Sequence, residues 1–324
     1  MVSQQPNSAC CQAPIQRFGG RRRRCRACGR TWRVYPHRRG RKRVRPTAHV
    51  VIRTIAERRP LGTQRGASLA ARRKRFQTAL RWWLAHTRPP AIPPGPLVLL
   101  IDGVWCRFGS HDWTLYLIAF KPLGESRAYF VDPPLLPGRE AGLTWHAVLQ
   151  ELGPDVLRRV VAVVTDGFRG SHTLARHHNW LHQRCHFHLV AQLQQRRGRH
   201  LQLPGAGAKQ TVYEAVRAAV VTDSPQILRR LQRQLRRALA DPACRGRVRL
   251  IVGGILRHLD AFRTYRRYPQ LDLPTTTNVV ESMARRIRDR IRTLRTPAAV
   301  QRWAVAIIRL RPSLKCNGRL YQPN

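Results

Sequence analysis

Acidic residues are scarce in this chain of 324 residues, which holds 16 Asp and Glu against 61 Lys and Arg, for a formal net charge of +45. A polyanionic partner best explains why a protein tolerates so much self-repulsion, so nucleic acid is the leading ligand class. Arginine dominates and suits bidentate phosphate contacts, although a GC-rich genome would also enrich it. Charge alone does not indicate an enzyme, because a ribosomal-type or nucleoid-binding protein would be equally basic.

Long apolar runs and a disulfide framework are also missing. No apolar run approaches the roughly 18–20 residues that span a bilayer, and the N-terminus lacks a basic segment followed by an apolar core. We therefore expect a cytoplasmic, nucleoid-associated protein without a membrane partner. The eight cysteines are too scattered for a disulfide scaffold, and in a cytosolic protein clustered cysteines more often bind metal.

Residues 1–45 form a basic arm with four cysteines that could hold a metal ion. Cys25 and Cys28 lie in a CxxC pair followed by a turn glycine, the spacing that points two thiolates at one tetrahedral ion. Cys10 and Cys11 are adjacent, whereas a regular first pair would be three residues apart. Three interpretations stay open: the adjacent pair ligates unusually, His37 substitutes, or the site has decayed. A structural zinc ion would order this zinc-ribbon-like segment, and the alternative is a metal-free basic arm.

Residues 46–87 have helical periodicity, interrupted by Pro-Leu-Gly at 60–62. They could form a helix-turn-helix that docks in the major groove of DNA, with Arg72, Arg73 and Arg75 facing phosphates. A helical linker with a solvated basic face would give the same pattern. Residues 88–96 are proline-rich, which predicts a stiff interdomain linker.

From residue 97 the pattern becomes that of an α/β domain, expected to extend to residue 310 and to be followed by a tail at 311–324. Apolar runs predict strands at 97–101, 114–121, 127–132 and 159–165, and a shorter strand at 184–187. Helices are predicted near 140–152 and 170–181. Strands that feed helices in this order imply a mixed sheet flanked by helices. Residues 189–262 are helical almost throughout, which indicates a helical insertion.

Three acidic residues are the candidates for chemistry. Asp102 and Asp166 each follow a predicted buried strand, and sites in open α/β sheets form just beyond strand ends, so both carboxylates can converge on one crevice. Glu281 lies on a predicted helix with an apolar stripe. Three hard oxygen ligands are what Mg²⁺ or Mn²⁺ prefers, and a pair of such ions can support an in-line displacement at phosphorus.

Each acidic residue also has a structural interpretation. An Asp-Gly pair after a strand is often merely a turn. Asn278 and Glu281 have the spacing of a helix capping box, which could coexist with metal binding because different oxygens are used. The functional interpretation depends on the conjunction of two strand-end aspartates, a helical glutamate and a charge of +45 in one chain.

Four motifs together resemble the Mutator-like DDE transposases of bacterial insertion sequences: Ile-Asp102-Gly, Thr-Asp166-Gly, Cys185-His-Phe-His188 and Thr-Thr-Asn-Val-Val-Glu281. The resemblance covers roughly residues 97–295. It implies a ribonuclease-H-like core in which the first aspartate ends the first strand, the second ends the fourth, and the glutamate lies on a late helix after a helical insertion. Cys185 and His188 match a family signature that organises the catalytic region or the DNA end; a buried cysteine and a satisfied core histidine would be the structural alternative.

The resemblance implies a DNA transposase that binds terminal inverted repeats and target DNA. Asp102, Asp166 and Glu281 would hold Mg²⁺ or Mn²⁺ for strand cleavage and strand transfer, a zinc ribbon would help to bind the repeats, and a synaptic complex would need at least a dimer. Arginines on the helix of Glu281 would follow the DNA backbone, unless they form a solvated face: Arg285, Arg286, Arg288, Arg290 and Arg292. Two other classes stay open, a non-catalytic DNA-binding protein derived from a transposase and a ribonuclease-H-like nuclease or resolvase.

Overall fold

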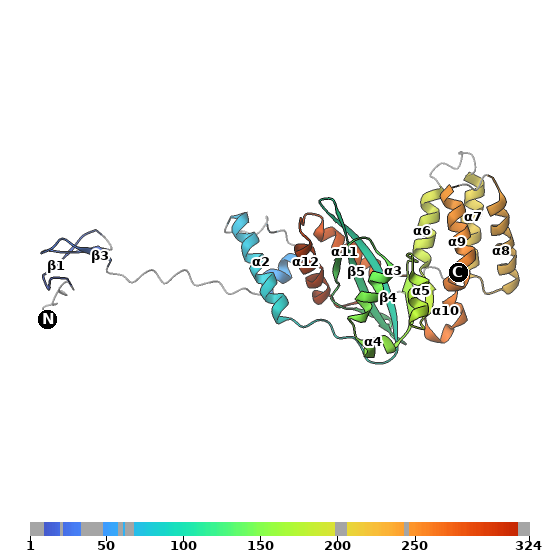
Figure 1. The fold of residues 1–324 in the computed structure, drawn as a ribbon, viewed down its shortest axis with the longest axis horizontal. Coiled ribbons are helices and arrows are strands. Elements are labelled where there is room, and N and C mark those ends of the chain that lie inside the picture. Colours follow the sequence, from blue (N-terminus) through green and yellow to red (C-terminus); the bar gives the residue numbers. More distant parts are fainter. Residues whose placement is uncertain are drawn as a thin grey trace. The chain divides into compact units, whose positions relative to one another are not determined.

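The computed structural model describes residues 10–19, 22–33, 48–57, 61, 68–197, 206–242 and 246–316. The chain forms two compact units, residues 1–47 and 48–324. The smaller unit, which contains the predicted zinc-ribbon-like arm, has an antiparallel sheet of three short strands in chain order (Figure 1). These are β1 (Ile15–Arg17), β2 (Arg22–Cys25) and β3 (Thr31–Arg33).

The larger unit is built on a seven-stranded mixed sheet with the strand order β10-β6-β5-β4-β8-β9, in which β7 pairs with β5. Its strands are β4 (Leu97–Phe108), β5 (His111–Pro122), β6 (Arg127–Phe130), β7 (Leu135–Pro137), β8 (Val160–Thr165), β9 (Leu181–Arg184) and β10 (Ser313–Lys315). β4, β5 and β6 form an antiparallel meander, whereas β8 runs parallel to β4 and β9 parallel to β8. The predicted α/β class with a mixed sheet flanked by helices is confirmed.

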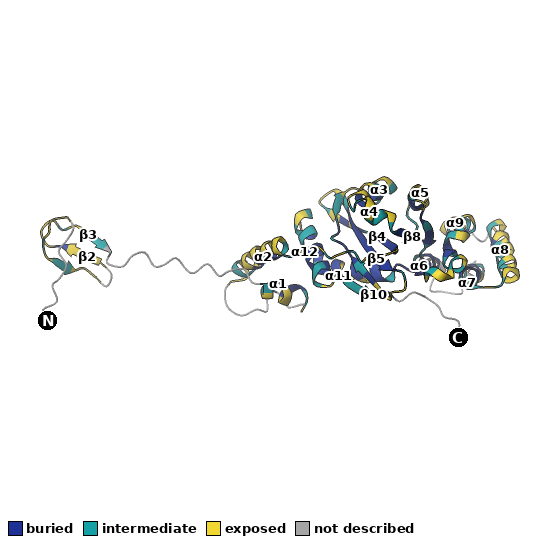
Figure 2. Ribbon diagram, turned by 90° about the horizontal axis from the view of Figure 1, so that it is seen from below, coloured by how far each residue is buried: buried dark blue, intermediate teal, exposed yellow. Residues whose placement is uncertain are grey.

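Alternate residues of β4 enter two different cores, one on each face of the sheet (Figure 2). Val98 and Leu100 pack with α1 (Ala48–Ile55), α2 (Leu69–His86), α11 (Asn278–Ile291) and α12 (Pro297–Leu310). Leu99 and Ile101 pack with α3 (Gly142–Gln150), α4 (Pro154–Arg158) and α5 (Ser171–His177). Because β4 is covered on both faces, it reads as a continuous apolar run in the sequence.

The predicted helical insertion corresponds to four helices with a hydrophobic core of their own: α6 (His186–Arg197), α7 (Ala206–Val221), α8 (Pro225–Ala240) and α9 (Gly246–Phe262). They come between β9 and α11 in the chain, and Figure 1 shows them as a bundle beside the sheet. Two short helices, α10 (Thr264–Arg267) and η2 (Pro269–Leu271), lead back towards α11. Among the residues that the structure describes, no helix combines the length and the apolar character needed to cross a bilayer.

The prediction of a short strand at 184–187 is wrong, and the helix predicted at 170–181 is longer than the observed α5. β9 is instead Leu181–Arg184, paired in parallel with residues 162–165 of β8, and α6 already begins at His186. The sequence of β9 hides the strand because its buried residues are polar. Gln183 is fully buried, and its amide group bonds to the backbone of Phe262, Arg184 and Tyr265.

Segments predicted to lie outside the α/β domain pack within the same unit. α1 and α2 share a core with the sheet and α12. Within the predicted linker 88–96, Ile92 packs against the core on the α3 side, and the Pro93 carbonyl accepts a hydrogen bond of 2.6 Å from Arg159. Residues 313–315, which the sequence analysis placed in a C-terminal tail, form β10 and pair with β6.

Candidate metal centres

Asp102 and Asp166 are brought together by the parallel pairing of β4 with β8. Leu100 pairs with Val164, so each aspartate lies two residues beyond this pair. β8 ends at Thr165, and Asp166 follows it as predicted. Asp102 does not end its strand, however, because β4 continues to Phe108 as the partner of β5 in a long hairpin. The prediction that a strand ends at Asp102 is therefore wrong, although the neighbouring parallel strand β8 does end next to it.

Asp102 is a buried acid with an unused oxygen. Its side chain belongs to the face of β4 that α11 covers, because it alternates with Leu100 and Val104 of that core. The residue is only 4% exposed, and its Oδ2 has no hydrogen-bond partner among the described residues. Burial, followed by the negative charges of Glu281 and Asp166, raises the pKa of Asp102 well above its usual value. A buried polar atom of this kind is costly unless a proton or a cation satisfies it.

Glu281 faces Asp102 from the first turn of α11, and His188 lies beside it. The His188 Nε2 is 2.9 Å from the Glu281 Oε1. This hydrogen bond lowers the pKa of Glu281, against an opposing effect of burial. Burial would lower the pKa of His188, but interactions with Cys185 and Glu281 outweigh it and raise that pKa to about 11. Asp102, His188 and Glu281 offer ligand atoms within 4.8 Å of one another, so this group could hold a metal ion.

Cys185 connects the end of β9 with the start of α11. Its buried Sγ accepts hydrogen bonds of 3.3 Å from both the backbone N–H and the hydroxyl of Thr277. The carbonyl of Thr277 in turn accepts the N–H of Glu281 at 2.9 Å. Burial would raise the pKa of the Cys185 thiol, but its interactions with His188 and Thr277 lower it. Cys185 and His188, singled out by the sequence as a pair, thus both contact the segment that positions Glu281.

The capping-box alternative for Glu281 is wrong. The N-cap of α11 is Thr277 rather than Asn278, and no side chain caps the helix there. Asn278 is therefore the first helical residue, and Glu281 lies four positions after the cap instead of the three that a capping box requires. The carboxylate of Glu281 is directed to His188 instead.

Asp166 lies near Asp102, but it is not one of the three residues whose ligand atoms lie within 4.8 Å of one another. Its Oδ1 accepts the N–H of Phe168 at 2.9 Å, as the turn interpretation of the Asp-Gly pair expects. Its charge nevertheless reaches Asp102, whose pKa it helps to raise. The next residue, Gly167, has a φ of +89°, and a Cβ there would lie 2.0 Å from the Nη2 of Arg184. Glycine at 167 therefore allows Arg184 to pack against the residue that follows Asp166.

Glu140 is a site residue that the sequence analysis missed. It precedes α3 on the opposite face of the sheet, and a Cβ at Gly103 would lie 2.7 Å from its carboxylate carbon. Trp145 donates a hydrogen bond of 2.7 Å to its Oε1. Burial, followed by the charge of Asp166, raises the pKa of Glu140 to about 7. No motif in the sequence indicates this residue; the glycine after Asp102 was a signal, but it was interpreted only as part of a turn.

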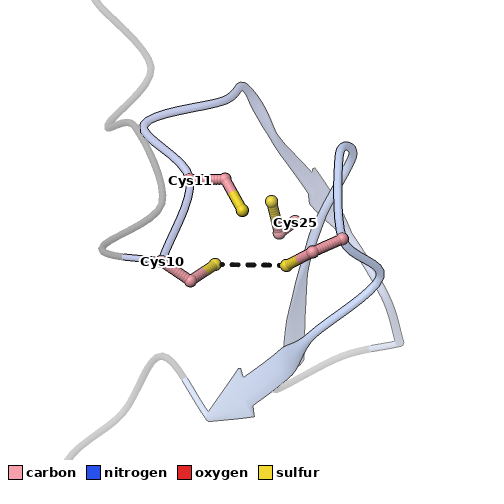
Figure 3. A group of neighbouring side chains, drawn as sticks. Cys10, Cys11 and Cys25 are labelled. Atoms are coloured by element: carbon pink, nitrogen blue, oxygen red, sulfur yellow. Dashed lines mark hydrogen bonds between the residues drawn. The ribbon is translucent and has the colours of Figure 1, made fainter.

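The smaller unit brings together all four N-terminal cysteines, and Figure 3 shows the side chains of Cys10, Cys11 and Cys25 converging. One sulfur atom from each lies within 4.8 Å of the others, and the Sγ atoms of Cys10 and Cys28 are 3.4 Å apart. The hydrogen bond with Cys28, followed by burial and Cys10, raises the pKa of Cys11 to about 12. The adjacent pair therefore does join the CxxC pair in one cluster that could hold a metal ion. His37 lies outside the described residues.

The basic residues predicted to contact DNA differ in exposure. On α2, Arg73 and Arg75 are exposed and Arg72 is half-buried. On α11, Arg285, Arg288 and Arg292 are exposed, whereas Arg286 and Arg290 are half-buried and line a pocket of about 350 Å³ against the end of α1. The Nη1 of Arg288 lies 3.9 Å from the Oε2 of Glu281, at the rim of the carboxylate group.

Comparison with known proteins assigns no family, because no protein-family model and no curated protein matches the chain. The chemistry of the donor atoms separates the two centres. Asp102 and Glu281 offer hard carboxylate oxygens, with Asp166 and Glu140 nearby, whereas the cysteine cluster offers soft thiolates. Hard oxygen donors suit magnesium, manganese or calcium, and sets of four thiolates suit zinc or iron–sulfur clusters.

Proposed function

We propose that the protein is a metal-dependent enzyme that transfers phosphoryl groups on DNA, and in particular a DDE-type transposase of an insertion sequence. The observation that carries the proposal is the buried Asp102, which has a free oxygen and lies in a group with Glu281 and His188 and close to Asp166. Such a concentration of carboxylates in a chain of net charge +45 combines a cation site with a surface suited to a polyanion.

The arrangement of the strands supports a ribonuclease-H-like core. Asp102 lies on the first strand of the larger sheet, Asp166 follows the strand parallel to it, and Glu281 lies on a late helix. A helical insertion precedes that helix, as the resemblance to Mutator-like transposases implies. The arrangement therefore agrees with the order of catalytic residues expected for that family.

In the proposed mechanism, Asp102, Asp166 and Glu281 hold Mg²⁺ or Mn²⁺. These cations supply activation of the attacking oxygen and stabilisation of the leaving oxygen in an in-line displacement. His188 orients the carboxylate of Glu281 through their hydrogen bond, and Cys185 holds the start of α11 through Thr277. Exposed arginines such as Arg288 neutralise the phosphates beside the scissile bond.

Two reactions would use this site in turn. In the first, the oxygen of water attacks a phosphorus atom at the end of the element, the bond to the 3′ oxygen breaks, and a free 3′-hydroxyl forms. In the second, that hydroxyl attacks a phosphorus atom of target DNA and displaces another 3′ oxygen. Both steps take place on DNA in the cytoplasm and need two element ends, so we propose a homo-oligomeric synaptic complex. The cysteine cluster would hold a structural Zn²⁺ and help to bind the terminal inverted repeats.

Asp102→Asn tests the proposal, with Asp155→Asn, an exposed aspartate on α4, as the matched control. Cleavage and joining of labelled DNA that carries the repeats flanking the gene are measured with Mg²⁺ or Mn²⁺, and DNA binding is measured in parallel. Because a metal ligand is lost, we expect Asp102→Asn to lower turnover by about 10³-fold or more, in the range seen when transition-state stabilisation is removed, while DNA binding stays within about twofold. The control should match the wild type.

Three outcomes would contradict the transposase assignment. Normal joining by Asp102→Asn would exclude this aspartate from catalysis. Cleavage without strand transfer in the wild type would favour a nuclease or resolvase. DNA binding without any cleavage would favour a non-catalytic protein derived from a transposase.

A further inference from the structure

Glu140 reaches the edge of β4 from the face opposite Glu281. Successive residues of a strand point to opposite faces, so Asp102 belongs to the face that α11 covers and Gly103 to the face that α3 covers. The carboxylate of Glu140 lies directly against Gly103. β8 ends at Thr165, so at this level β4 has no neighbouring strand on that side. Side chains from both faces of the sheet can therefore reach this exposed edge of β4. Acidic side chains therefore approach the same stretch of β4 from both faces, and the charge of Asp166 raises the pKa of both Asp102 and Glu140.

Gly103, the residue after Asp102, leaves room for the Glu140 carboxylate because it has no side chain. A Cβ at Gly103 would lie 2.7 Å from the Cδ of Glu140 and 2.8 and 2.9 Å from its two oxygens, closer than a Cβ atom tolerates. Any other residue at 103 would push the carboxylate away from the strand. The glycine therefore serves the close approach of Glu140 and not a turn, since it lies inside β4 and pairs with Tyr116.

These carboxylates form no direct ion pair with Lys or Arg among the described residues, although the charge of Arg184 acts on Asp166 and that of His188 on Asp102. The chain has 61 Lys and Arg, yet within the described part of the chain no ion pair joins a basic side chain to Asp102, Glu140 or Asp166. Glu140 receives one hydrogen bond, from Trp145, although an ionised carboxylate can accept several. The buried Oδ2 of Asp102 receives none. One oxygen of Asp102 thus has no partner and the Glu140 carboxylate has only one, a situation that a bound cation resolves.

We propose that Glu140 is a fourth carboxylate of the centre and that it holds, with Asp102 and Asp166, a second divalent cation beside the one at Asp102, His188 and Glu281. This inference rests on the proposed cation site, and it places both cations at the edge of β4 beyond the end of β8, one nearer Glu281 and the other nearer Glu140. Asp102 is shared between them. Trp145 positions the Glu140 carboxylate by its hydrogen bond, and Gly103 leaves room for it.

The test is a titration of the full chain with Mn²⁺, followed by electron paramagnetic resonance and calorimetry. It compares the wild type with Asp102→Asn, Glu140→Gln and the control Glu151→Gln, an exposed glutamate at the end of the same helix α3. The glutamine at 140 keeps an oxygen for Trp145, so its melting temperature in chelator should not fall below that of the wild type. Other Mn²⁺ sites contribute equally to all proteins, so the differences report the centre.

We expect Asp102→Asn to lose two Mn²⁺ ions relative to the wild type, Glu140→Gln to lose one, and Glu151→Gln to lose none. If Asp102→Asn loses Mn²⁺ but Glu140→Gln binds as many ions as the wild type, with affinities within about twofold, the role of Glu140 is overturned and the proposed function stands. If Asp102→Asn loses no ion, the cation site of the proposed function fails, and this inference fails with it.

Gly103→Ala provides a second test that leaves every proposed ligand in place. The added methyl group displaces the Glu140 carboxylate, so this variant should also lose one Mn²⁺ ion. In the double variant with Glu140→Gln, no further ion should be lost, because both changes act on the same carboxylate. Wild-type binding by Gly103→Ala would overturn the close approach on which the proposal depends.

Discussion

Asp102 and Glu281 show how position sets the state of two similar carboxyl groups. Burial and negative neighbours raise the pKa of Asp102, whereas the hydrogen bond with His188 lowers the pKa of Glu281. Without a cation, the proton is therefore best placed on Asp102, while Glu281 stays ionised beside a protonated His188. A divalent cation would displace that proton, because it stabilises the charged carboxylate. Cation binding at this centre should accordingly weaken as the pH falls.

His182 is a buried histidine that makes the fold sensitive to acid. Burial, followed by repulsion from Arg184, lowers its pKa from 6.5 to about 3, and its Nε2 is 3.0 Å from the hydroxyl of Thr165. The unfolded chain thus binds one more proton than the folded chain between pH 6.5 and 3. The free energy of unfolding must fall as the pH falls through this window, by up to about 1.4 kcal/mol per pH unit for this residue.

His182→Asn should remove this contribution. Between pH 7 and pH 5, we expect the wild type to lose about 2 kcal/mol more stability than the variant, since about 1.5 pH units of the window are crossed. The measurement is urea denaturation at both pH values in the presence of chelator. His111→Asn, at an exposed position, should keep the wild-type pH dependence. Equal acid sensitivity of the wild type and His182→Asn would contradict the assignment.

Among the elements, α12 shares an apolar core with α2 and the sheet, and one of its arginines also bonds to both. Arg309 donates to both carboxylate oxygens of Asp132, at 3.1 and 3.0 Å, and to the carbonyl of Leu84 at 2.8 Å. It also donates to the hydroxyl of Thr87 at 3.0 Å. Asp132 follows β6, whereas Leu84 and Thr87 lie at the end of α2. The arginine therefore joins three segments that are far apart in the sequence.

Arg309→Ala should destabilise the larger unit by roughly 3–5 kcal/mol, because it leaves the carboxylate of Asp132 and the carbonyls of α2 without their charged partner in a largely buried place. Thermal and urea denaturation would measure the loss. Arg311→Ala removes an exposed arginine two residues later and should change stability by less than about 0.5 kcal/mol. A loss below about 1 kcal/mol for Arg309→Ala would show that α2 is held by apolar packing alone.

For the whole molecule, the division into two compact units means that their stabilities should be separable. The smaller unit has short strands and is basic, so we expect its order to depend on a metal ion held by the cysteine cluster. The larger unit has three apolar cores that do not involve the cysteines of the cluster.

Removal of zinc should therefore unfold the smaller unit only. After reconstitution with Zn²⁺, a strong chelator, or the change Cys28→Ser, should abolish the dispersed amide signals of the smaller unit in NMR spectra. The melting temperature of the larger unit should shift by less than about 2 °C, which corresponds to less than about 1 kcal/mol for a domain of this size. Cys106→Ser changes a buried cysteine outside the cluster and should leave zinc content unchanged. Zinc content that is equal in the wild type and Cys28→Ser would contradict the cluster as the zinc site.

Much of the fold could be predicted because its elements are marked by local patterns. Apolar runs in the sequence mark β4, β5 and β8. Apolar residues at helical spacing mark α6 to α9 and α11. β9 was misplaced because hydrogen bonds, and not apolar side chains, satisfy its buried Gln183. The N-cap of α11 was misplaced by one residue because Cys185, which is distant in the sequence, holds Thr277.

By itself, the sequence determined the charge of +45, the α/β class, and the residue types able to bind cations: three acids and four cysteines. The tertiary structure decided which of them meet. Parallel register places Asp102 level with Asp166, and the packing of α11 places Glu281 opposite Asp102. The role of Gly103 beside Glu140 likewise became visible only in the fold. These contacts join residues far apart in the chain, and they depend on strand register and on which face each helix covers, which local periodicity does not specify.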